Sequence, residues 1–388
     1  MTAALAGSRR TTHVDLDRRP ILVFWESTRA CRLACRHCRA DAMPHPAPGE
    51  LTPEESIRFI ESLADFGRPA PILVITGGDA LMRPDLLELV DAARAASVTP
   101  ALAPSVTPLL TDERLAELRQ HGVKMASLSL DGASAETHEG LRQIEGHFAE
   151  TLAALHRLRA HGFVLQVNTV VTAENVEELP AIAKIVRDCG AAIWEVFFLI
   201  QVGRGSAMAE LSPAENEDVC LFLYDASRYD FIVRTVEGPF FRRIVTWRRE
   251  GVTLQPGPLY QRLARRLYEQ LGPPTTESKA QTKGTRDGRG IVFVSSTGDV
   301  YPAGFLPVRL GDVREQTITE IYREHPLMLN IRAARFTGRC GRCEYKSLCG
   351  GSRARAFASS GDPLGEDPAC AYEPGSIATN AEGRLAGV

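Results

Sequence analysis

The chain of 388 residues is long enough for two to three structural units of about 150 residues each. Apolar residues make up 44% and charged residues 24%, which excludes a disordered or fibrous chain and is typical of a folded enzyme. The net charge of −3 argues against a nucleic-acid partner, and no apolar run of signal-peptide or membrane-spanning type occurs. These features predict a cytoplasmic protein with no membrane partner.

Apolar runs of strand length alternate with helical patterns in the first half of the chain. Thr52, Pro53 and Glu55 have the spacing of a helix start, and Pro84 begins another helical run. Right-handed βα units of this kind predict an α/β fold, a partial (βα)6 TIM-like barrel with its site at the C-terminal ends of the strands. The expected strands are residues 21–25, 72–76, 98–103, 125–130, 164–171 and 193–199.

Three cysteines, Cys31, Cys35 and Cys38, follow the first expected strand. Nine cysteines in a reducing compartment indicate metal or redox chemistry rather than disulfides. Three thiolates on one loop leave a metal site open, so either a remote ligand closes it or an iron atom binds substrate. His37 is the candidate fourth ligand if the metal is zinc.

The spacing of these cysteines resembles the signature of the radical S-adenosylmethionine (SAM) superfamily, with His37 in the position of its usual aromatic residue. The resemblance implies a [4Fe–4S] cluster on Cys31, Cys35 and Cys38 whose fourth iron chelates S-adenosylmethionine. Reductive cleavage of this cofactor supplies a 5′-deoxyadenosyl radical that abstracts a hydrogen atom from the substrate.

Further positions resemble the cofactor-binding residues of the same superfamily. Gly77, Gly78 and Asp79 match its GGE motif, in which glycines admit a close ligand and the carboxylate pairs with the methionine ammonium group; aspartate shortens that reach. A role in a turn or helix cap is an equal alternative for Ser105 and Asp131. The alternative for Arg142 is a surface ion pair. The side chain of Asn168 is expected to point either into the barrel lumen or to a solvated edge. The resemblance places Ser105, Ser129, Asp131 and Arg142 near the cofactor, and Asn168 is a further candidate because it is a polar residue inside an apolar strand.

The alternation of strands and helices is expected to end near Ser212, and a linker rich in Pro, Thr, Gly and Lys precedes a second domain. In that domain we expect a hairpin over residues 291–301 and a short helix near 319–322. The expected divisions are an N-terminal tail (1–19), the barrel (20–211), a connecting and substrate-covering segment (212–290), a cysteine-rich domain (291–376) and a frayed tail (377–388).

The cysteine-rich domain carries Cys340, Cys343, Cys349 and Cys370, which are enough thiolates to close a zinc or an iron–sulfur site. Its sequence resembles the SPASM or twitch extension of radical SAM enzymes, which holds auxiliary clusters. Two cysteines of a full SPASM domain are replaced by Ala303 and Arg353. The resemblance therefore implies one auxiliary [4Fe–4S] cluster, two clusters in all, and a reductant of the flavodoxin or ferredoxin type.

The substrate is open between several classes. The sequence around the first cysteines resembles the SPASM enzymes of alternative haem and haem d1 biosynthesis, which act on propionates of iron tetrapyrroles, for example by oxidative decarboxylation; SPASM enzymes that modify peptides are the alternative. Residues 252–290 contain seven basic and three acidic residues and are expected to cover an anionic substrate or to form a solvated face. A zinc-stabilised scaffold and a degenerate family member without turnover are the other hypotheses.

Overall fold

The computed structural model describes residues 14–388 except 253, 283, 377, 380–384 and 387–388. Its main sheet has ten strands in the order β10-β9-β8-β1-β2-β3-β4-β5-β6-β7. Strands β8 and β1 to β7 run parallel to one another, and β9 and β10 add antiparallel pairs beyond β8 at one edge. The strands are β1 (Leu22–Thr28), β2 (Ile72–Gly77), β3 (Thr99–Leu102), β4 (Met125–Ser129), β5 (Val164–Val171), β6 (Ile193–Phe198), β7 (Ile232–Val236), β8 (Ile291–Val294), β9 (Asp299–Tyr301) and β10 (Gly311–Asp312).

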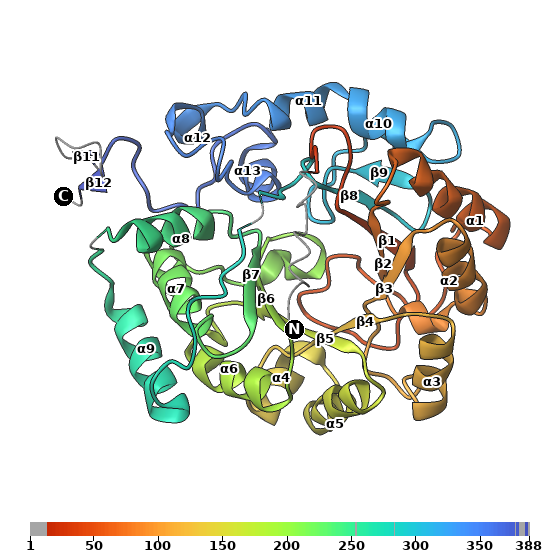
Figure 1. Ribbon diagram of the computed structural model, residues 1–388, viewed down its shortest axis with the longest axis horizontal. Helices are drawn as coiled ribbons and strands as arrows, with labels where there is room; N and C mark the ends of the chain where they lie inside the picture. Colours follow the sequence, from red (N-terminus) through yellow and green to blue (C-terminus); the bar gives the residue numbers. More distant parts are fainter. Residues whose placement is uncertain (1–13, 253, 283, 377, 380–384, 387–388) are drawn as a thin grey trace, which may run out of the picture.

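Helices follow the strands and cover the outside of the curved sheet (Figure 1). Helix α1 begins at the expected capping box: Thr52 accepts from the Glu55 amide, and the Glu55 side chain accepts from the Thr52 amide. The helices are α1 (Pro53–Ser62), α2 (Leu86–Ala95), α3 (Asp112–Gln120), α4 (Ala135–Arg142), α5 (His147–Ala160), α6 (Leu179–Asp188), α7 (Pro213–Ala226), α8 (Phe241–Glu250), α9 (Pro258–Leu271), α10 (Ile318–Glu324), α11 (Pro326–Arg332), α12 (Gly338–Arg342) and α13 (Arg353–Ser360). Single 3₁₀ turns are η1 (Leu63–Phe66), η2 (Ala80–Met82), η3 (Val176–Glu178) and η4 (Gly203–Ala207).

The core lies between the sheet and these helices. Trp25 on β1 is fully buried and meets Phe59 of α1 edge to face, with ring centroids 5.6 Å apart. Along β5 every second residue from Leu165 to Val171 is buried, and Asn168 and Val170 between them line the barrel cavity. The alternation therefore turns one face of β5 to the helices and the other to the cavity.

The expectation that the βα alternation ends near Ser212 is wrong. Helix α7 begins with a capping box at Ser212, and β7 pairs in parallel with β6. Only Val233 of β7 is fully buried, and Arg234 and Thr235 interrupt its apolar residues, so no apolar run of strand length marks it in the sequence. The parallel sheet is therefore longer than the six strands expected.

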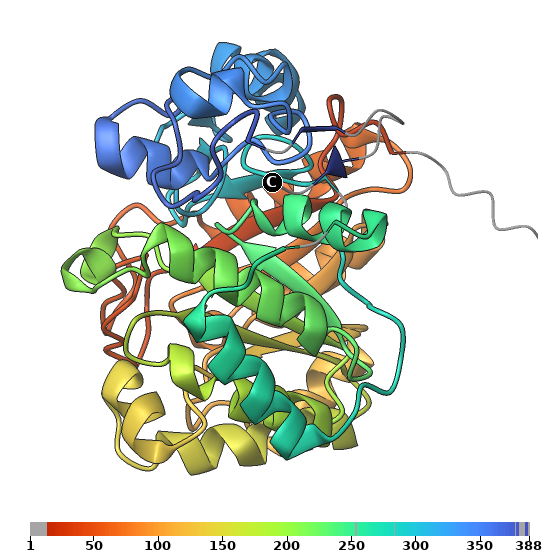
Figure 2. The same cartoon turned by 90° about the vertical axis from the view of Figure 1, so that its left-hand side faces the viewer.

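The expected hairpin is formed by β8 and β9, and the expected short helix is α10. Strand β8 also pairs in parallel with β1, from Leu22 opposite Ile291 to Trp25 opposite Val294. The cysteine-rich segment thus begins as part of the barrel sheet. Both views place α10 to α13 on one side of the molecule and α3 to α5 on the opposite side (Figures 1 and 2).

Both ends of the chain, which were predicted to be tails, form specific contacts in the residues that the structure describes. Leu16 is buried, its carbonyl accepts a hydrogen bond from the Tyr322 hydroxyl, and Asp17 pairs with Arg289. Near the other end, β11 (Ala378–Thr379) pairs with β12 (Leu385–Ala386). The rest of both expected tails, residues 1–13 and most of 377–388, lies outside the described residues. No helix in the described part of the chain is long and apolar enough to cross a bilayer.

Candidate functional site

Three cysteines converge on a cavity at the C-terminal ends of the barrel strands. The cavity, here the barrel cavity, has a volume of about 1110 Å³ and is lined by Cys31, Cys35, Cys38, Gly77 and Gly78, among others. The loop that carries the cysteines is tied down because the Cys31 amide donates to the Met43 carbonyl at 2.8 Å. The Leu33 amide lies 3.4 Å from the Cys31 sulfur and the Ala42 amide 3.5 Å from that of Cys38. Such N–H groups stabilise thiolate charge.

The two glycines at the end of β2 pack directly on this loop. A Cβ on Gly77 would lie 2.3 Å from the Thr28 carbonyl oxygen, and one on Gly78 would lie 2.3 Å from that of Ala30. Gly77 also has φ +134°, which other residues rarely adopt. The Gly77–Gly78 backbone therefore forms a cavity wall that a side chain would displace.

Asp79 does not line this cavity, in contrast to the expectation that its carboxylate pairs with an ammonium group there. Its side chain is fully buried and accepts hydrogen bonds from the Leu81 amide at 3.1 Å, the Ser105 amide at 3.3 Å and the Thr107 hydroxyl at 2.8 Å. Burial raises the pKa of this carboxyl group. Asp79 thus joins the ends of β2 and β3 from inside the protein.

Ser105, Ser129 and Asn168 all line the barrel cavity. The Ser105 hydroxyl donates to the Gly78 carbonyl at 2.9 Å and lies 3.7 Å from the Cys31 sulfur. Ser129 and Asn168 are register partners on β4 and β5. Asn168 accepts a hydrogen bond from Gln166 at 2.8 Å. Because Asn168 lines the cavity, its side chain faces the lumen and not a solvated edge.

Asp131 and Arg142 form a buried ion pair rather than a turn and a surface residue. Burial opposes charge on Asp131, but Arg142 holds the pKa of this carboxyl group below its usual value. The pair raises the pKa of Arg142 against the same burial. The other end of the guanidinium lies 3.5 Å from the Cys35 sulfur, so Arg142 places positive charge beside the cysteine loop.

His37 lies between the cysteines and Asp131, with its Nε2 atom 3.5 Å from the Asp131 carboxylate. Burial lowers the pKa of His37 to about 4, so the imidazole is neutral near pH 7. Among the described residues, the buried Nδ1 of His37, Nε of Arg142 and Nη2 of Arg204 have no hydrogen-bond partner. All three residues line the barrel cavity, where the two arginine donors fit acceptor atoms of a ligand and Nδ1 of the neutral His37, whose Nε2 faces Asp131, fits a donor.

Arg39 and Arg204 were missed in the sequence. Arg204, in η4, donates to the Cys35 carbonyl at 2.9 Å and to that of Ala42 at 3.1 Å, and so clamps the cysteine loop from the end of β6. Gly203 packs against the same loop, where a Cβ would lie 2.6 Å from the Cys38 carbonyl oxygen. The glycines on both sides of Arg204 were the sequence signal for a close backbone contact, but the sequence does not show that this contact is with the cysteine loop.

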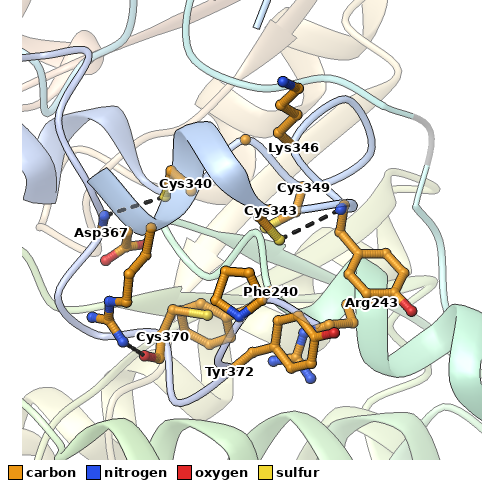
Figure 3. Close-up of a pocket in the computed structure, with 14 residues that line it drawn as sticks. Phe240, Arg243, Cys340, Cys343, Lys346, Cys349, Asp367, Cys370 and Tyr372 are labelled. Carbon is orange, nitrogen blue, oxygen red and sulfur yellow. Dashed lines mark hydrogen bonds between the residues drawn. The ribbon is translucent and has the colours of Figure 1, made fainter. Parts of the chain in front are cut away.

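The four C-terminal cysteines surround a second cavity of about 470 Å³, here the tail cavity (Figure 3). Burial raises the pKa of Cys349 to about 11 and that of Cys370 to about 12, so these thiols need a bound cation to ionise near pH 7. No three His, Cys, Asp or Glu side chains among the described residues are arranged to hold a single metal ion. Four thiols around one cavity are the number that closes an iron–sulfur or a zinc site.

Arg353, at the position of an absent SPASM cysteine, is fully buried beside this cavity. It donates to the Pro363 carbonyl at 3.1 Å and the Gly365 carbonyl at 2.6 Å, and its Nη2 lies 3.6 Å from the Cys340 sulfur. Gly351 has φ +63° and leaves room for Cys340, since a Cβ there would lie 2.9 Å from that sulfur. Arg353 thus holds this loop beside the Cys340 thiol.

One side chain joins the two cavities. Arg355 donates to the Leu199 carbonyl of the barrel cavity at 3.0 Å, and its Nη1 lies 3.4 Å from the Asp367 carboxylate of the tail cavity. The Asp367 amide in turn lies 3.4 Å from the Cys340 sulfur. A continuous set of polar contacts therefore runs from one cavity wall to the other.

The basic segment does not cover the barrel cavity where it is described. Helix α9 packs on α6 and α7, and two of its arginines, Arg262 and Arg266, pair with Glu177. The remaining described basic residues bond elsewhere: Arg265 to Glu269, Lys279 to Asp230, Arg286 to the Ser347 carbonyl and Arg289 to Asp17. Lys283 lies outside the described residues. Arg39, Arg142 and Arg204 supply the positive charge at the cavity instead.

Comparison with known proteins agrees with the two cysteine centres. The radical SAM superfamily matches residues 25–186, and the SPASM iron–sulfur cluster-binding domain matches residues 286–344. The chain is 37% identical to the AdoMet-dependent heme synthase of Methanosarcina barkeri, over 93% of this chain and 99% of that protein. It is 30% identical to the mycofactocin maturase MftC of Mycobacterium ulcerans, over 94% of this chain and 91% of that protein.

The crystal structure of Streptococcus suis SuiB bound to its precursor peptide SuiA has the same fold, with a TM-score of 0.67 at 14% identity, over 92% of this chain and 76% of that chain. The matched domains and the near full-length relatives favour a radical SAM enzyme over a zinc-stabilised scaffold. The protein belongs to the radical SAM superfamily: it is an enzyme that binds S-adenosylmethionine and a [4Fe–4S] cluster, and its SPASM domain binds auxiliary iron–sulfur.

Proposed function

We propose that this enzyme modifies propionate side chains of an iron tetrapyrrole, by oxidative decarboxylation. The observation that carries the proposal is the 37% identity to an AdoMet-dependent heme synthase over nearly the whole of both chains. The barrel cavity supports it, because aromatic side chains and arginines with unpaired donors meet there. Each propionate would lose one hydrogen atom, carbon dioxide and one electron, which a one-electron acceptor must take.

The residues of the barrel cavity have distinct roles in this proposal. Cys31, Cys35 and Cys38 hold the cluster, and the Gly77–Gly78 backbone receives the methionine end of S-adenosylmethionine. Cleavage of that cofactor at the reduced cluster supplies the 5′-deoxyadenosyl radical that abstracts hydrogen. The other cofactor contacts are His37 beside the cluster, Arg142 at the cofactor carboxylate, and Ser105, Ser129 and Asn168 along the cavity wall. Asp131 orients Arg142, and Asp79 orients the glycine turn.

The tail cavity would hold one auxiliary [4Fe–4S] cluster on Cys340, Cys343, Cys349 and Cys370. Four thiolates close its coordination, which suits electron transfer and leaves no vacant iron. Because the positions of two further ligands are Ala303 and Arg353, we expect two clusters per chain. A flavodoxin or ferredoxin in the cytoplasm is the expected reductant.

The test is anaerobic incubation of the reconstituted enzyme with S-adenosylmethionine, a strong reductant and iron coproporphyrin III. We expect mass spectrometry to show loss of carboxyl groups, with at least one 5′-deoxyadenosine formed for each group lost. If the enzyme makes 5′-deoxyadenosine but leaves the tetrapyrrole unchanged, the proposal is wrong. Peptide modification is then the favoured alternative, since a mycofactocin maturase is also similar over most of the chain.

A further inference from the structure

The barrel cavity has two chemically different sides. The cysteine loop, Ser129 and Asn168 form a polar side. The other side, here the aromatic wall, contains Phe197 at the end of β6 and Phe305 in the loop after β9. Their ring centroids are 6.3 Å apart and the rings are tilted by 58°. The barrel and the SPASM domain therefore both contribute to one apolar surface, which suits a broad, flat ligand.

Arg39 lies between these two sides and is fixed from two directions. Its Nη2 donates to Glu26 at 2.8 Å, and its guanidinium carbon lies 4.5 Å from the centre of the Phe293 ring. The side chain is 22% exposed and lines the cavity. Its other guanidinium N–H groups make no hydrogen bond with any described residue. A guanidinium that is held in place with unused donors is prepared to bind a carboxylate.

Like Arg39, the neighbouring arginines each have a protein partner, but Arg142 and Arg204 are bound to the cysteine centre itself. Arg142 is paired with Asp131, and Arg204 uses two of its donors on the cysteine loop. Arg36 lies on the same loop as Arg39 but forms a paired contact with Glu174, with distances of 2.8 and 2.9 Å, and does not line the cavity. Arg39 packs on Phe293 of β8, and a Cβ on Gly304, the residue before Phe305, would lie 3.5 Å from its Nε atom, so Arg39 borders the loop that carries Phe305.

We propose that Arg39 binds a carboxylate of the substrate while Phe197 and Phe305 pack against the flat body that carries it. The inference rests on the proposed function, because it names the residues that would select a planar, carboxylate-bearing tetrapyrrole. Arg39 acts here as a substrate-binding and specificity-determining residue. Glu26 and Phe293 are positioning residues, because they hold the guanidinium in place without lining the cavity themselves.

The experiment measures binding to the reconstituted enzyme without reductant. Iron coproporphyrin III and its tetramethyl ester are titrated, and the Soret absorption band reports the affinity. The wild-type enzyme should bind the acid at least tenfold more tightly than the ester. Arg39→Gln should weaken binding of the acid by about 10- to 100-fold and leave that of the ester within about twofold, since a charge-assisted contact is lost only for the acid.

Two further variants separate charge from shape. Arg36→Gln, a matched change on the same loop, should leave both affinities unchanged. Phe305→Ala should weaken acid and ester to a similar extent, because both have the same flat body. Iron content and melting temperature are measured for every variant. If Arg39→Gln loses iron, the variant Arg39→Lys is used in its place. Its affinity for the acid should be about three- to tenfold lower than that of the wild type, because lysine keeps the positive charge but cannot form the two parallel hydrogen bonds of a guanidinium.

The outcomes distinguish the inference from the proposed function. If the wild-type enzyme binds neither tetrapyrrole, the proposed function is wrong and the inference falls with it. If the wild-type enzyme binds the acid and Arg39→Gln or Arg39→Lys binds it equally well, the assignment of Arg39 is wrong and the proposed function stands. Equal losses for acid and ester in Arg39→Gln would also overturn the assignment, since the effect would then not involve the carboxylate.

Discussion

The Asp79 side chain organises the wall of the barrel cavity without forming part of it. Its two oxygens accept from Leu81, Ser105 and Thr107, and the Ser105 hydroxyl then bonds to the Gly78 carbonyl. A shift of Asp79 would therefore move the glycine turn and the serine together. This indirect arrangement accounts for an aspartate at a position where the superfamily motif has the longer glutamate.

Asp79→Ala and Asp79→Asn should have different effects. Alanine leaves buried donors without an acceptor and should lower the free energy of unfolding by about 1–3 kcal/mol. Asparagine keeps an acceptor and should leave affinity for S-adenosylmethionine within about threefold. Chemical denaturation and equilibrium dialysis measure the two quantities. A tenfold weaker cofactor affinity in Asp79→Asn, with unchanged stability, would instead indicate direct contact with the cofactor.

At the scale of elements, two buried histidines connect α4 and α5 to the strand ends. His138 accepts from the Asp131 amide at 3.1 Å and lies 2.9 Å from His147, which donates to the Val106 carbonyl at 3.1 Å. In this series of hydrogen bonds each ring uses one nitrogen as a donor and the other as an acceptor, so both rings must be neutral. Burial lowers the pKa of His138 to about 3 and lowers that of His147 as well.

Stability should therefore fall in mild acid. Below about pH 6.5 the unfolded chain protonates these histidines while the folded chain does not, so the free energy of unfolding decreases by up to about 1.4 kcal/mol per pH unit per histidine. Denaturation midpoints of the holoenzyme between pH 7.5 and 5.5 should show this slope, and His138→Gln should reduce it. His156→Gln, an exposed change on α5, is the control. Equal slopes in wild type and His138→Gln would contradict the assignment.

The elements differ in how far the sequence predicts them. Strands β1 to β6 are marked by apolar runs, whereas β7 has one fully buried residue and was missed. Asn168 was identified because a polar residue inside an apolar strand must face the lumen or an edge. The roles of Asp79 and Arg204 were not predictable, since they depend on where loops meet: Arg204 contacts Cys35 across 169 positions of sequence.

At the scale of the whole molecule, the two cysteine centres are joined through Arg355, which contacts the walls of both cavities. The centres nevertheless have different chemistry available to them. Three thiols in the barrel leave one iron open to a ligand, whereas the four thiols in the tail close their site. We therefore expect cofactor cleavage to depend on the first centre and substrate conversion to depend on both.

Cys35→Ala and Cys343→Ala test this division. The wild-type enzyme should contain about eight iron atoms in two [4Fe–4S] clusters. Cys35→Ala should form no 5′-deoxyadenosine, whereas Cys343→Ala should still form it while making no product. Iron analysis, chromatography and protease protection are the measurements, because loss of a cluster also affects folding. About twelve iron atoms per chain would contradict the expected two clusters. A folded Cys343→Ala enzyme that forms product at the wild-type rate would contradict the division of roles between the two centres.

The parallel pairing of β8 with β1 has a consequence for how the protein can be divided. Cleavage of the chain before Ile291 would remove the neighbour of β1 and expose the backbone of Leu22 to Trp25 as an open sheet edge. Open edges of apolar strands recruit other chains. A fragment of residues 1–290 is therefore expected to aggregate at concentrations where the full-length protein is monodisperse in light scattering, so the SPASM segment also protects the barrel from self-association.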